Sequence, residues 1–426
     1  MLIRFRVKNY RSIRDSQVLD LRRAGNGTRS RLAIDDNDRV AEDVTPVAAI
    51  YGANASGKST VLSALEYVRE TVRSSARTEA GIPIPVEYFR LDPKSAHSPF
   101  ECDLVFRHNE SDYQYGFEIR EGEVAKEYLY QTPVHAPRRN KTMLFSRTGQ
   151  DITPGARLGG PKATIIRATR PNSLFLSKAA QENHPLLTSV YAWFQTSRNL
   201  DSRVAVNELE SDEVLRHGVA ILLRVADLGV QDLSIERPPT RPPKEFVEDI
   251  AKTMTGSDDA AALQQAEEWL MQVNTQVVLS HRGVNGHSYP LPPGLESDGT
   301  RVFLNLLVIT QRVLAAGGQL QMDEISNLHP LMVRAIIEMF QSQRWNPHGA
   351  QLLFTTHDVS LLGDFGGFGY MLDRDQIWFT EKSSEGVTEI TPLTDFHPRN
   401  TDNIEKAYIM GLFGAIPSLD QLLLER

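Results

Sequence analysis

Residues 47–65 constrain the fold of this chain more than any other stretch of its 426 residues. An apolar run at 47–51 is followed by a glycine-bearing loop at 52–60 and then by a helix-forming segment at 61–65. The loop fits the pattern G-x-x-x-x-G-K-[ST] with no mismatch. Glycines let backbone N–H groups close around phosphates, and the start of a helix adds partial positive charge. The order of strand, loop and helix therefore predicts a nucleotide-binding site.

Each part of this loop has an expected role. Lys58 would reach the β and γ phosphates of ATP, and Ser59 would hold Mg²⁺. The nucleotide-binding residues predicted here are Gly52, Asn54, Ser56, Gly57, Lys58, Ser59 and Thr60. A glycine-rich turn that matches by chance is the alternative, and the strand and helix that flank the loop argue against it.

A polar and basic turn at residues 9–14 interrupts short strands expected in the first fifty residues. This turn either lies near the base or phosphates of the nucleotide or is a solvated hairpin. The sequence leaves both interpretations open.

Composition narrows the class of protein. The chain has 46 basic and 54 acidic residues, a net charge of -8, so no overall positive charge indicates a nucleic-acid binder. The single cysteine, Cys102, excludes an internal disulfide and a cysteine metal cluster, and we expect it in the core. Residues 1–7 do not resemble a signal peptide, and no window approaches the roughly 18 apolar residues of a membrane span. We therefore expect a cytoplasmic protein without a membrane partner.

Periodic patterns predict the other elements. Apolar and mostly polar residues alternate through 100–119, which predicts a β-meander whose aromatic residues form a sheet core rather than a platform for bases. Helices are expected over much of 173–225, and a helical pair within 245–273 follows a proline-rich break. Because no heptad pattern is sustained, no long coiled coil is expected.

Two further apolar strands are predicted to end in polar residues. The first ends at Asp323 and Glu324, where an aspartate can hold Mg²⁺ through water and the adjacent glutamate can polarise the attacking water. One helix later, the second ends at His357, whose imidazole could sense a γ-phosphate. A solvated strand end is the alternative in both cases, and the nucleotide loop upstream favours the functional interpretation.

A second anion site is suggested by Ser297, Asp298, Gly299 and Thr300, just before a helix expected from about residue 302. A serine hydroxyl and a glycine N–H at a helix start are donors for an anion. The same residues also fit a plain helix cap, so this pattern alone leaves both interpretations open.

Lys58 and Asp323 are separated by far more residues than one βαβ unit requires. We therefore expect a large insertion between the two halves of the site.

Together these features resemble the ABC-type ATPase heads of the SMC-like and OLD-type superfamily. In chain order, residues 52–59 resemble the Walker A loop, Ser297 to Thr300 the signature motif, Asp323 and Glu324 the Walker B pair, residues 327–330 the D-loop and His357 the switch histidine. The resemblance implies an α/β fold: an ABC-type P-loop ATPase head with a mixed sheet, an antiparallel β subdomain, a RecA-like lobe and a helical insertion. The expected parts are an N-terminal ATPase lobe at 1–198, the helical insertion at 199–275 and a C-terminal ATPase lobe at 276–426.

The chain departs from the family pattern at two places. The interval between Glu324 and His329 is one residue tighter than the usual spacing, so the spacing does not fix Asn327 as the D-loop residue. A Q-loop glutamine is not found either, because residues 89–92, where the strand before it should end, contain none.

Other stretches are similar to one branch of this superfamily. Residues 9–13, 172–177, 375–379 and 411–417 are similar to bacterial AbiL/RloA-like anti-phage ATPases, which include the ATPase subunit of the PARIS system. The similarity implies a homo-oligomeric sensor and scaffold that controls an effector encoded beside it, expected to be a TOPRIM-type nuclease. DNA or a phage protein is the expected trigger.

The family also implies that one chain holds only half of each composite site. Ser297 and Gly299 of one subunit would cover the γ-phosphate that Lys58 of another subunit binds. Glu324, with His357 as its catalytic neighbour, would orient the attacking water for hydrolysis of ATP to ADP and phosphate.

Two other functions stay open from the sequence. An SMC-like ATPase of DNA repair or recombination would show salt-sensitive DNA binding and DNA-stimulated hydrolysis. The negative charge and missing coiled coil count against it, whereas basic residues leave room for it: Arg4, Arg6, Lys8, Arg138 and Arg139. A transporter's nucleotide-binding subunit would need a membrane partner, and the long separation of the two half-sites disfavours it.

Overall fold

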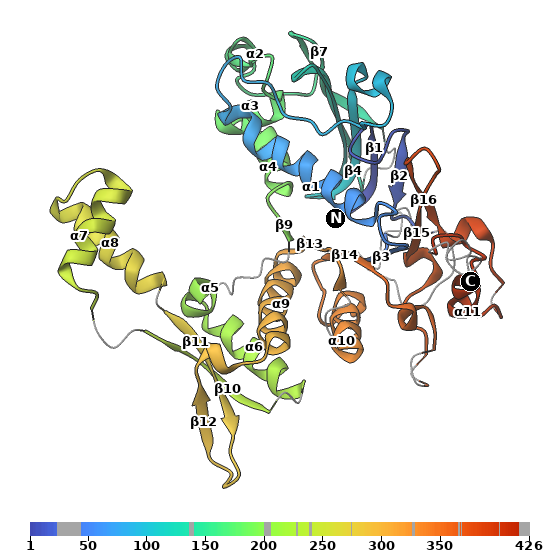
Figure 1. Cartoon of the computed structure of the whole chain (residues 1–426). Helices are drawn as coiled ribbons and strands as arrows, with labels where there is room; N and C mark the ends of the chain where they lie inside the picture. The colour runs from blue at the N-terminus through green and yellow to red at the C-terminus, as the bar shows by residue number, and fades with distance from the viewer. Residues whose placement is uncertain are drawn as a thin grey trace. The chain divides into compact units, whose positions relative to one another are not determined.

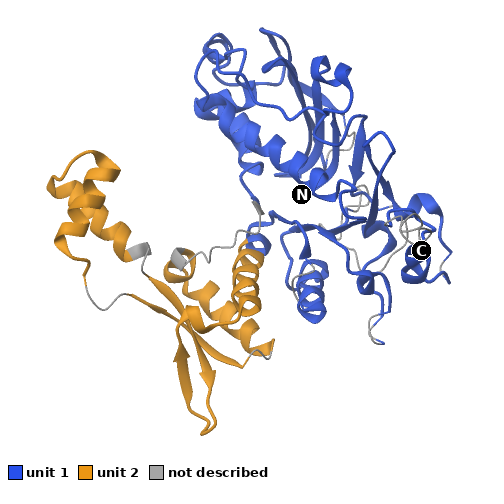
Figure 2. Ribbon diagram, viewed as in Figure 1, with its two compact units in different colours: residues 1–199, 313–426 blue, residues 200–312 orange. Residues whose placement is uncertain are grey.

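The computed structural model describes residues 1–23, 44–135, 140–199, 206–226, 229–237, 241–273, 275–325, 329–364, 367, 369–399 and 401–416. The chain divides into two compact units (Figure 2). Unit 1 comprises residues 1–199 and 313–426, and unit 2 comprises residues 200–312.

A six-stranded sheet in unit 1 contains the apolar run that precedes the glycine loop (Figure 1). Its order is β16-β15-β3-β14-β13-β9, with bounds Thr388–Pro392, Ile377–Lys382, Val47–Gly52, Gln351–Thr356, Gln319–Met322 and Ser197–Asn199. All neighbouring pairs are parallel except β15 with β16. β3 and β14 are buried at every position, as strands covered on both faces are. The carboxyl ends of the parallel strands therefore meet at one edge.

Helices cover both faces of this sheet. α1 (Lys58–Ser74) and α10 (Pro330–Gln341) both contact β3 and β14, and Figure 1 shows them on opposite sides of the strands. Leu62, Leu65 and Val68 of α1 enter the core at helical spacing, as predicted. The loop before α1 thus starts from the carboxyl edge of the sheet.

A seven-stranded antiparallel sheet, also in unit 1, confirms the predicted meander. Its order is β2-β1-β4-β5-β6-β7-β8, with bounds Gln17–Asp20, Leu2–Lys8, Phe100–His108, Ser111–Arg120, Glu123–Pro133, Thr142–Thr148 and Asp151–Pro154. Phe100, Cys102 and Phe106 of β4 are at most 2 % exposed. The aromatic residues therefore form a sheet core, and Cys102 is the core residue expected.

Short helices complete unit 1. They are α2 (Ala163–Ala168), α3 (Phe175–Gln181), α4 (Pro185–Trp193) and α11 (Ile404–Ile409). The fully buried Glu127 of β6 accepts hydrogen bonds from the N–H groups of Phe175 (2.6 Å) and Leu176 (3.0 Å) at the start of α3. Burial raises the pKa of this carboxyl, while Arg147 and these N–H groups lower it. The contact joins the antiparallel sheet to α3.

Unit 2 combines helices with a small antiparallel sheet. Its elements are α5 (Val206–Ser211), α6 (Glu213–Val225), β10 (Val230–Glu236), α7 (Lys244–Thr255), α8 (Ala260–Val273), β11 (Gln276–Arg282), β12 (Ser288–Leu291) and most of α9 (Asp298–Ala316). The strand order is β10-β11-β12. Arg312 of α9 binds Glu208 at 3.0 Å and Asp212 at 2.9 Å, which ties α9 to α5 and α6. Among the described residues no helix is longer than α9, which has 19 residues.

The observed units differ from the division expected from the sequence. Residues 276–312, expected in a C-terminal lobe, lie in unit 2 with the insertion. The reason is strand pairing, because β11 pairs with β10 along Val230–Glu236 and β12 pairs with β11. β10 was not expected: its apolar alternation is short and stands between a helix and a proline-rich break. The insertion is therefore not purely helical.

Candidate nucleotide-binding and hydrolysis site

The glycine loop connects the carboxyl end of β3 to the start of α1. Gly57 has φ 111°, a backbone conformation that residues with a side chain rarely adopt. A Cβ atom on Gly57 would collide with the side chain of Thr388, and one on Gly52 would lie 2.6 Å from the carbonyl oxygen of Thr380. Both glycines are thus required by close approach of neighbouring strands, besides any contact with a ligand.

Two threonines hold the loop from the adjacent strands β15 and β16. Thr380 Oγ1 lies 2.7 Å from Ser56 Oγ, and the Thr388 hydroxyl donates to the Ser56 carbonyl oxygen at 2.8 Å. Thr388 Oγ1 is also 2.8 Å from Ser12 Oγ, in the turn at residues 9–14. The sequence analysis missed both threonines, because a strand threonine has no local pattern that marks it as a loop support.

The amine of Lys58 is hydrogen-bonded to acceptors of the protein itself. Its Nζ donates to the carbonyl oxygens of Gly52 (3.0 Å) and Ala53 (3.1 Å), and lies 3.0 Å from His357 Nε2. Burial lowers the pKa of Lys58 from its ordinary 10.5, while Glu324 and Asp323 raise it. The amine is therefore held beside the loop with part of its hydration removed.

The paired carboxylates that follow β13 reach the same place. Ser59 Oγ donates to Asp323 Oδ1 at 2.9 Å, and Glu324 Oε2 lies 3.2 Å from His357 Nε2. This convergence follows from the sheet order, because β14 pairs with both β3 and β13. The structure thus brings together the predicted loop lysine and serine, the two carboxylates and the histidine.

Two shallow cavities share part of their lining, and one of them adjoins the loop. One of about 270 Å³ is lined by Arg11, Ser12, Ala55, Gly57, Lys58, Ser59, Thr60 and Lys382. A second, of about 300 Å³, shares Arg11, Ser12 and Lys382 and extends to Glu87, Tyr88, Phe89, Arg90, Leu91 and Gly386. The turn at residues 9–14 therefore lies beside the loop, and its contact with a nucleotide stays a prediction. Lys382, at the end of β15, was missed.

The predicted signature residues belong to unit 2, whereas the glycine loop belongs to unit 1. α9 begins at Asp298, roughly one turn before the expected start. Ser297 Oγ accepts a hydrogen bond from the N–H of Thr300 at 3.1 Å, and Asp298 pairs with Arg301. Ser297 therefore caps the helix, while Ser297, Asp298 and Gly299 are exposed.

Three other expectations have different outcomes. The D-loop candidate Asn327 lies outside the described residues. The strand expected to end at residues 89–92 is wrong, because this segment is irregular and its Phe89 N–H donates to the Asn9 side chain at 3.2 Å. His329 caps α10, with its Nδ1 accepting from the N–H of Leu331 at 3.3 Å.

The basic residues that left room for DNA binding are engaged in β1. Arg4 binds Asp103 at 2.8 Å, and Lys8 binds Glu101 at 2.8 Å with Arg6 at 3.6 Å from the same carboxylate. Arg138 and Arg139 lie outside the described residues. Each of these three β1 cations thus has a carboxylate partner, with Arg6 and Lys8 sharing Glu101.

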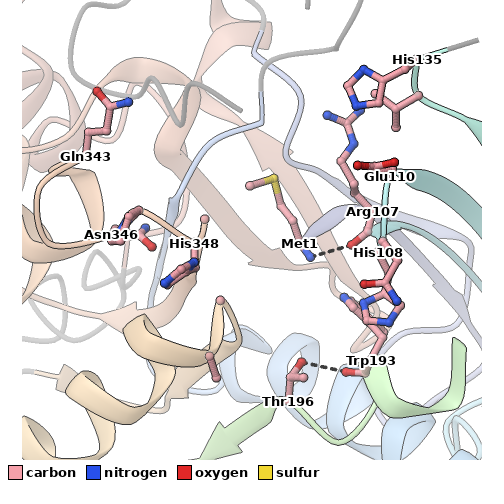
Figure 3. Close-up of a pocket in the computed structure, with 16 residues that line it drawn as sticks. Met1, Arg107, His108, Glu110, His135, Trp193, Thr196, Gln343, Asn346 and His348 are labelled. Atoms are coloured by element: carbon pink, nitrogen blue, oxygen red, sulfur yellow. Dashed lines mark hydrogen bonds between the residues drawn. The ribbon is translucent and has the colours of Figure 1, made fainter. Parts of the chain in front are cut away.

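A larger cavity of about 460 Å³ lies at the amino ends of β13 and β14, away from the glycine loop (Figure 3). Its lining includes His108, His135 and His348, which Figure 3 shows around the opening with Arg107 and Glu110. Arg107 is paired with Asp112 at 2.7 Å. In the described part of the chain no cluster of three or more histidine, cysteine or acidic side chains could hold a metal ion. This cavity takes no part in the site at the carboxyl edge.

Comparison with solved structures finds a similarity to the "Crystal structure of the SmcHead bound to the C-winged helix domain of ScpA", with 10% sequence identity and a TM-score of 0.39. The match covers 92% of this chain and 97% of that chain. No curated protein matches the sequence significantly. Among the described helices, none is both long and apolar enough to cross a membrane.

A family model matches residues 47–363, well over half of the chain, and its description is "AAA domain, putative AbiEii toxin, Type IV TA system". The matched region begins with β3 and the glycine loop and extends past the carboxylates and His357. The predicted α/β P-loop ATPase fold, with a mixed sheet and an antiparallel β layer, is confirmed. By this match and this fold, the chain belongs to that family of AAA ATPase domains.

Proposed function

We propose that this chain binds ATP with Mg²⁺ and hydrolyses it to ADP and phosphate. One observation carries the proposal: Lys58, Ser59, Asp323, Glu324 and His357 converge at the carboxyl edge of one parallel sheet, linked by contacts of 2.9–3.2 Å. Membership of an AAA ATPase family supports it.

The residues present fit Mg²⁺. Ser59 Oγ and Asp323 Oδ1 lie 2.9 Å apart, and hydroxyl and carboxylate oxygens are the ligands that this ion prefers. Ser59 and Asp323 would hold Mg²⁺, directly or through water, beside phosphates cradled by the loop. When bound, the ion neutralises charge on the phosphate oxygens.

Lys58 would exchange partners when ATP binds. Its amine would leave the carbonyl oxygens of Gly52 and Ala53, on which it rests at 3.0 and 3.1 Å, for phosphate oxygens. This exchange also separates Lys58 from His357, whose Nε2 faces both Lys58 and Glu324. The imidazole is then free to contact the γ-phosphate, and Glu324 to orient the attacking water.

The second cavity, which shares Arg11, Ser12 and Lys382 with the first, would hold the base and ribose of the nucleotide. It continues from the first cavity past Arg11 and Lys382 to Tyr88 and Leu91, whose accessible side chains offer aromatic and apolar surface. A base needs such a surface, whereas inorganic phosphate does not. We therefore assign this cavity to the base and ribose.

We further propose that hydrolysis requires association of two or more copies. Ser297, Asp298 and Gly299 are exposed at the start of α9, where a hydroxyl and N–H donors could cover the γ-phosphate held by another copy. The oligomer would act as a sensor and scaffold in anti-phage defence. Its effector would be a partner protein encoded beside it, a TOPRIM-type nuclease by the sequence resemblance.

The direct test measures ATP binding and phosphate release by the wild type and by Glu324→Gln. We expect the wild type to hydrolyse ATP, and the variant to bind ATP with similar affinity while losing at least about 100-fold in turnover. Glu182→Gln is a matched control, because this carboxylate pairs with Lys178 at the end of α3 and contributes to neither cavity beside the loop. Hydrolysis by Glu324→Gln at the wild-type rate would overturn the assignment.

For the partner, the neighbouring gene product would be co-expressed with the wild type and with Lys58→Ala. Co-purification of a stable complex supports the scaffold proposal. A chain that never binds this product in either nucleotide state contradicts it.

A further inference from the structure

A single hydroxyl holds both carboxylate residues of the site in place. Thr355, in β14, is fully buried, and the parallel register that pairs Met322 with Phe354 sets it beside Asp323. Its Oγ1 donates to Asp323 Oδ1 at 2.7 Å and accepts from the N–H of Glu324 at 2.8 Å. The hydroxyl thus donates its hydrogen to Asp323 and accepts a hydrogen bond from the backbone of Glu324.

The backbone at Glu324 explains why such support is needed. Glu324 has φ 61°, in the left-handed region that residues with a Cβ avoid. The conformation turns the chain sharply after β13 and places Oε2 of Glu324 3.2 Å from His357. The hydrogen bond that the Glu324 N–H donates to Thr355, in the neighbouring strand β14, stabilises this turn.

Asp323 has two hydroxyl partners with different positions. Its Oδ1 accepts from Ser59 at 2.9 Å and from Thr355 at 2.7 Å. The Ser59 hydroxyl would turn to Mg²⁺ when ATP binds, whereas Thr355 is fixed inside the sheet. Thr355 therefore keeps the Asp323 carboxylate oriented after the Ser59 contact is exchanged.

We propose that Thr355 is a positioning residue for ATP hydrolysis, acting through Asp323 and Glu324. Its hydroxyl fixes the position of the Asp323 carboxylate, which would hold Mg²⁺, relative to the Glu324 carboxylate, which would orient the attacking water. This inference rests on the proposed ATPase function. It predicts an effect on turnover that exceeds any effect on ATP binding.

The chain offers a matched control at Thr45, just before β3. Thr45 is also a buried threonine of unit 1, at 1 % exposure, but its hydroxyl has no hydrogen-bond partner among the residues that the structure describes. Thr45→Val and Thr355→Val both keep the β-branched shape and remove one hydroxyl. They differ in whether that hydroxyl contacts the carboxylate residues.

The experiment measures steady-state ATP hydrolysis and thermal unfolding of the full chain for four proteins: wild type, Thr355→Val, Thr355→Ser and Thr45→Val. For Thr355→Val we expect kcat to fall by about 10- to 100-fold, with KM for ATP changed by less than about threefold. Thr355→Ser, which restores the hydroxyl, is expected to stay within about fivefold of the wild type. Thr45→Val should hydrolyse ATP at the wild-type rate. If Thr355→Val does not fold, Thr355→Cys replaces it in the same comparison, because a thiol is a weak hydrogen-bond donor and acceptor and should also lower kcat with little change in KM. A wild-type kcat for Thr355→Cys would overturn the positioning role.

The outcomes separate the inference from the function on which it rests. A Thr355→Val protein that turns over at the wild-type rate overturns the positioning role and leaves the ATPase intact. The same conclusion follows if Thr355→Ser loses as much turnover as Thr355→Val, or if KM rises while kcat is unchanged. A wild-type protein without any ATP hydrolysis overturns the proposed function itself.

Discussion

Ser59 donates a hydrogen bond of 2.9 Å to Asp323, and this bond links the segment after the glycine loop to the end of β13. Ser59 lies in the first turn of α1, Asp323 directly follows β13, and the whole of unit 2 separates them in sequence. A Mg²⁺ site made from them would therefore depend on how β3, β14 and β13 pair side by side.

Replacing Ser59 with alanine removes one of the two oxygen ligands proposed for Mg²⁺. We expect the Mg²⁺ concentration for half-maximal hydrolysis to rise by about tenfold or more. A MgCl₂ titration at saturating ATP measures it. Ser74→Ala is the control, because this serine lies at the other end of α1 and donates to the carbonyl oxygen of Glu70. An unchanged Mg²⁺ requirement in Ser59→Ala would refute the metal role.

Gly57→Ala should impair ATP binding for two reasons. The added Cβ would collide with Thr388, and φ 111° is unfavourable for alanine. Since left-handed backbone alone costs roughly 1–2 kcal/mol, we expect ATP affinity to fall at least about tenfold. Gly81→Ala isolates strain from collision, because Gly81 also has positive φ, 82°, but open space around it. Calorimetric titration with ATP that gave equal affinities for Gly57→Ala and the wild type would contradict this prediction.

The affinity for ATP should decline at alkaline pH through Lys58. Burial lowers the pKa of this amine below 10.5, so it loses its proton at a lower pH than an exposed lysine. Bound phosphates favour the charged form, and ATP binding therefore weakens as pH rises through the lowered pKa. Lys58→Arg stays charged throughout, so its ATP affinity should lack this decline. Parallel slopes for the two proteins would argue against the assignment of Lys58.

The ATP-bound form should be larger than the free form. Because Glu324→Gln is expected to retain ATP, its mass in solution with ATP should correspond to two or more copies, and without ATP to fewer. Lys58→Ala should not change mass with ATP. Light scattering at matched concentrations measures this, and a Glu324→Gln mass that is unaffected by ATP speaks against nucleotide-driven association.

Mixing two inactive variants tests whether the site is shared between copies. In a mixed dimer of Lys58→Ala and Ser297→Arg, one site contains an intact loop and an intact signature. Random pairing would restore about a quarter of wild-type activity. Each variant alone should stay inactive. A mixture no more active than its components would mean that Ser297 does not complete a site in another copy.

The site residues could be predicted from the sequence where they belong to a short contiguous motif. Gly52 to Ser59 follow a strand and start a helix, and Asp323 and His357 follow apolar strands, so the order of these motifs grouped them into one site. Parallel strands of one sheet bring their carboxyl ends together. That physical rule explains why residues so far apart were correctly grouped.

The remainder depends on contacts that no local pattern encodes. Thr355, Thr380 and Thr388 support the site from neighbouring strands, and a threonine in a buried strand is ordinary for its β-branched shape. β10 of unit 2 was missed for a related reason: it is stabilised by pairing with β11, which is distant in sequence. The start of α9 was placed too late because Ser297 caps it with a bond that periodicity does not reveal.

β9 and β13 are neighbouring parallel strands, and the chain between them is the whole of unit 2. A parallel pair always needs a connection that returns to the start of the next strand, and nothing in the pairing limits its length. Unit 2 is thus an enlarged crossover. Insertions or exchanges within it are compatible with an unchanged sheet, so the sequence of unit 2 can change while the carboxyl edge that positions Lys58 and Asp323 stays the same.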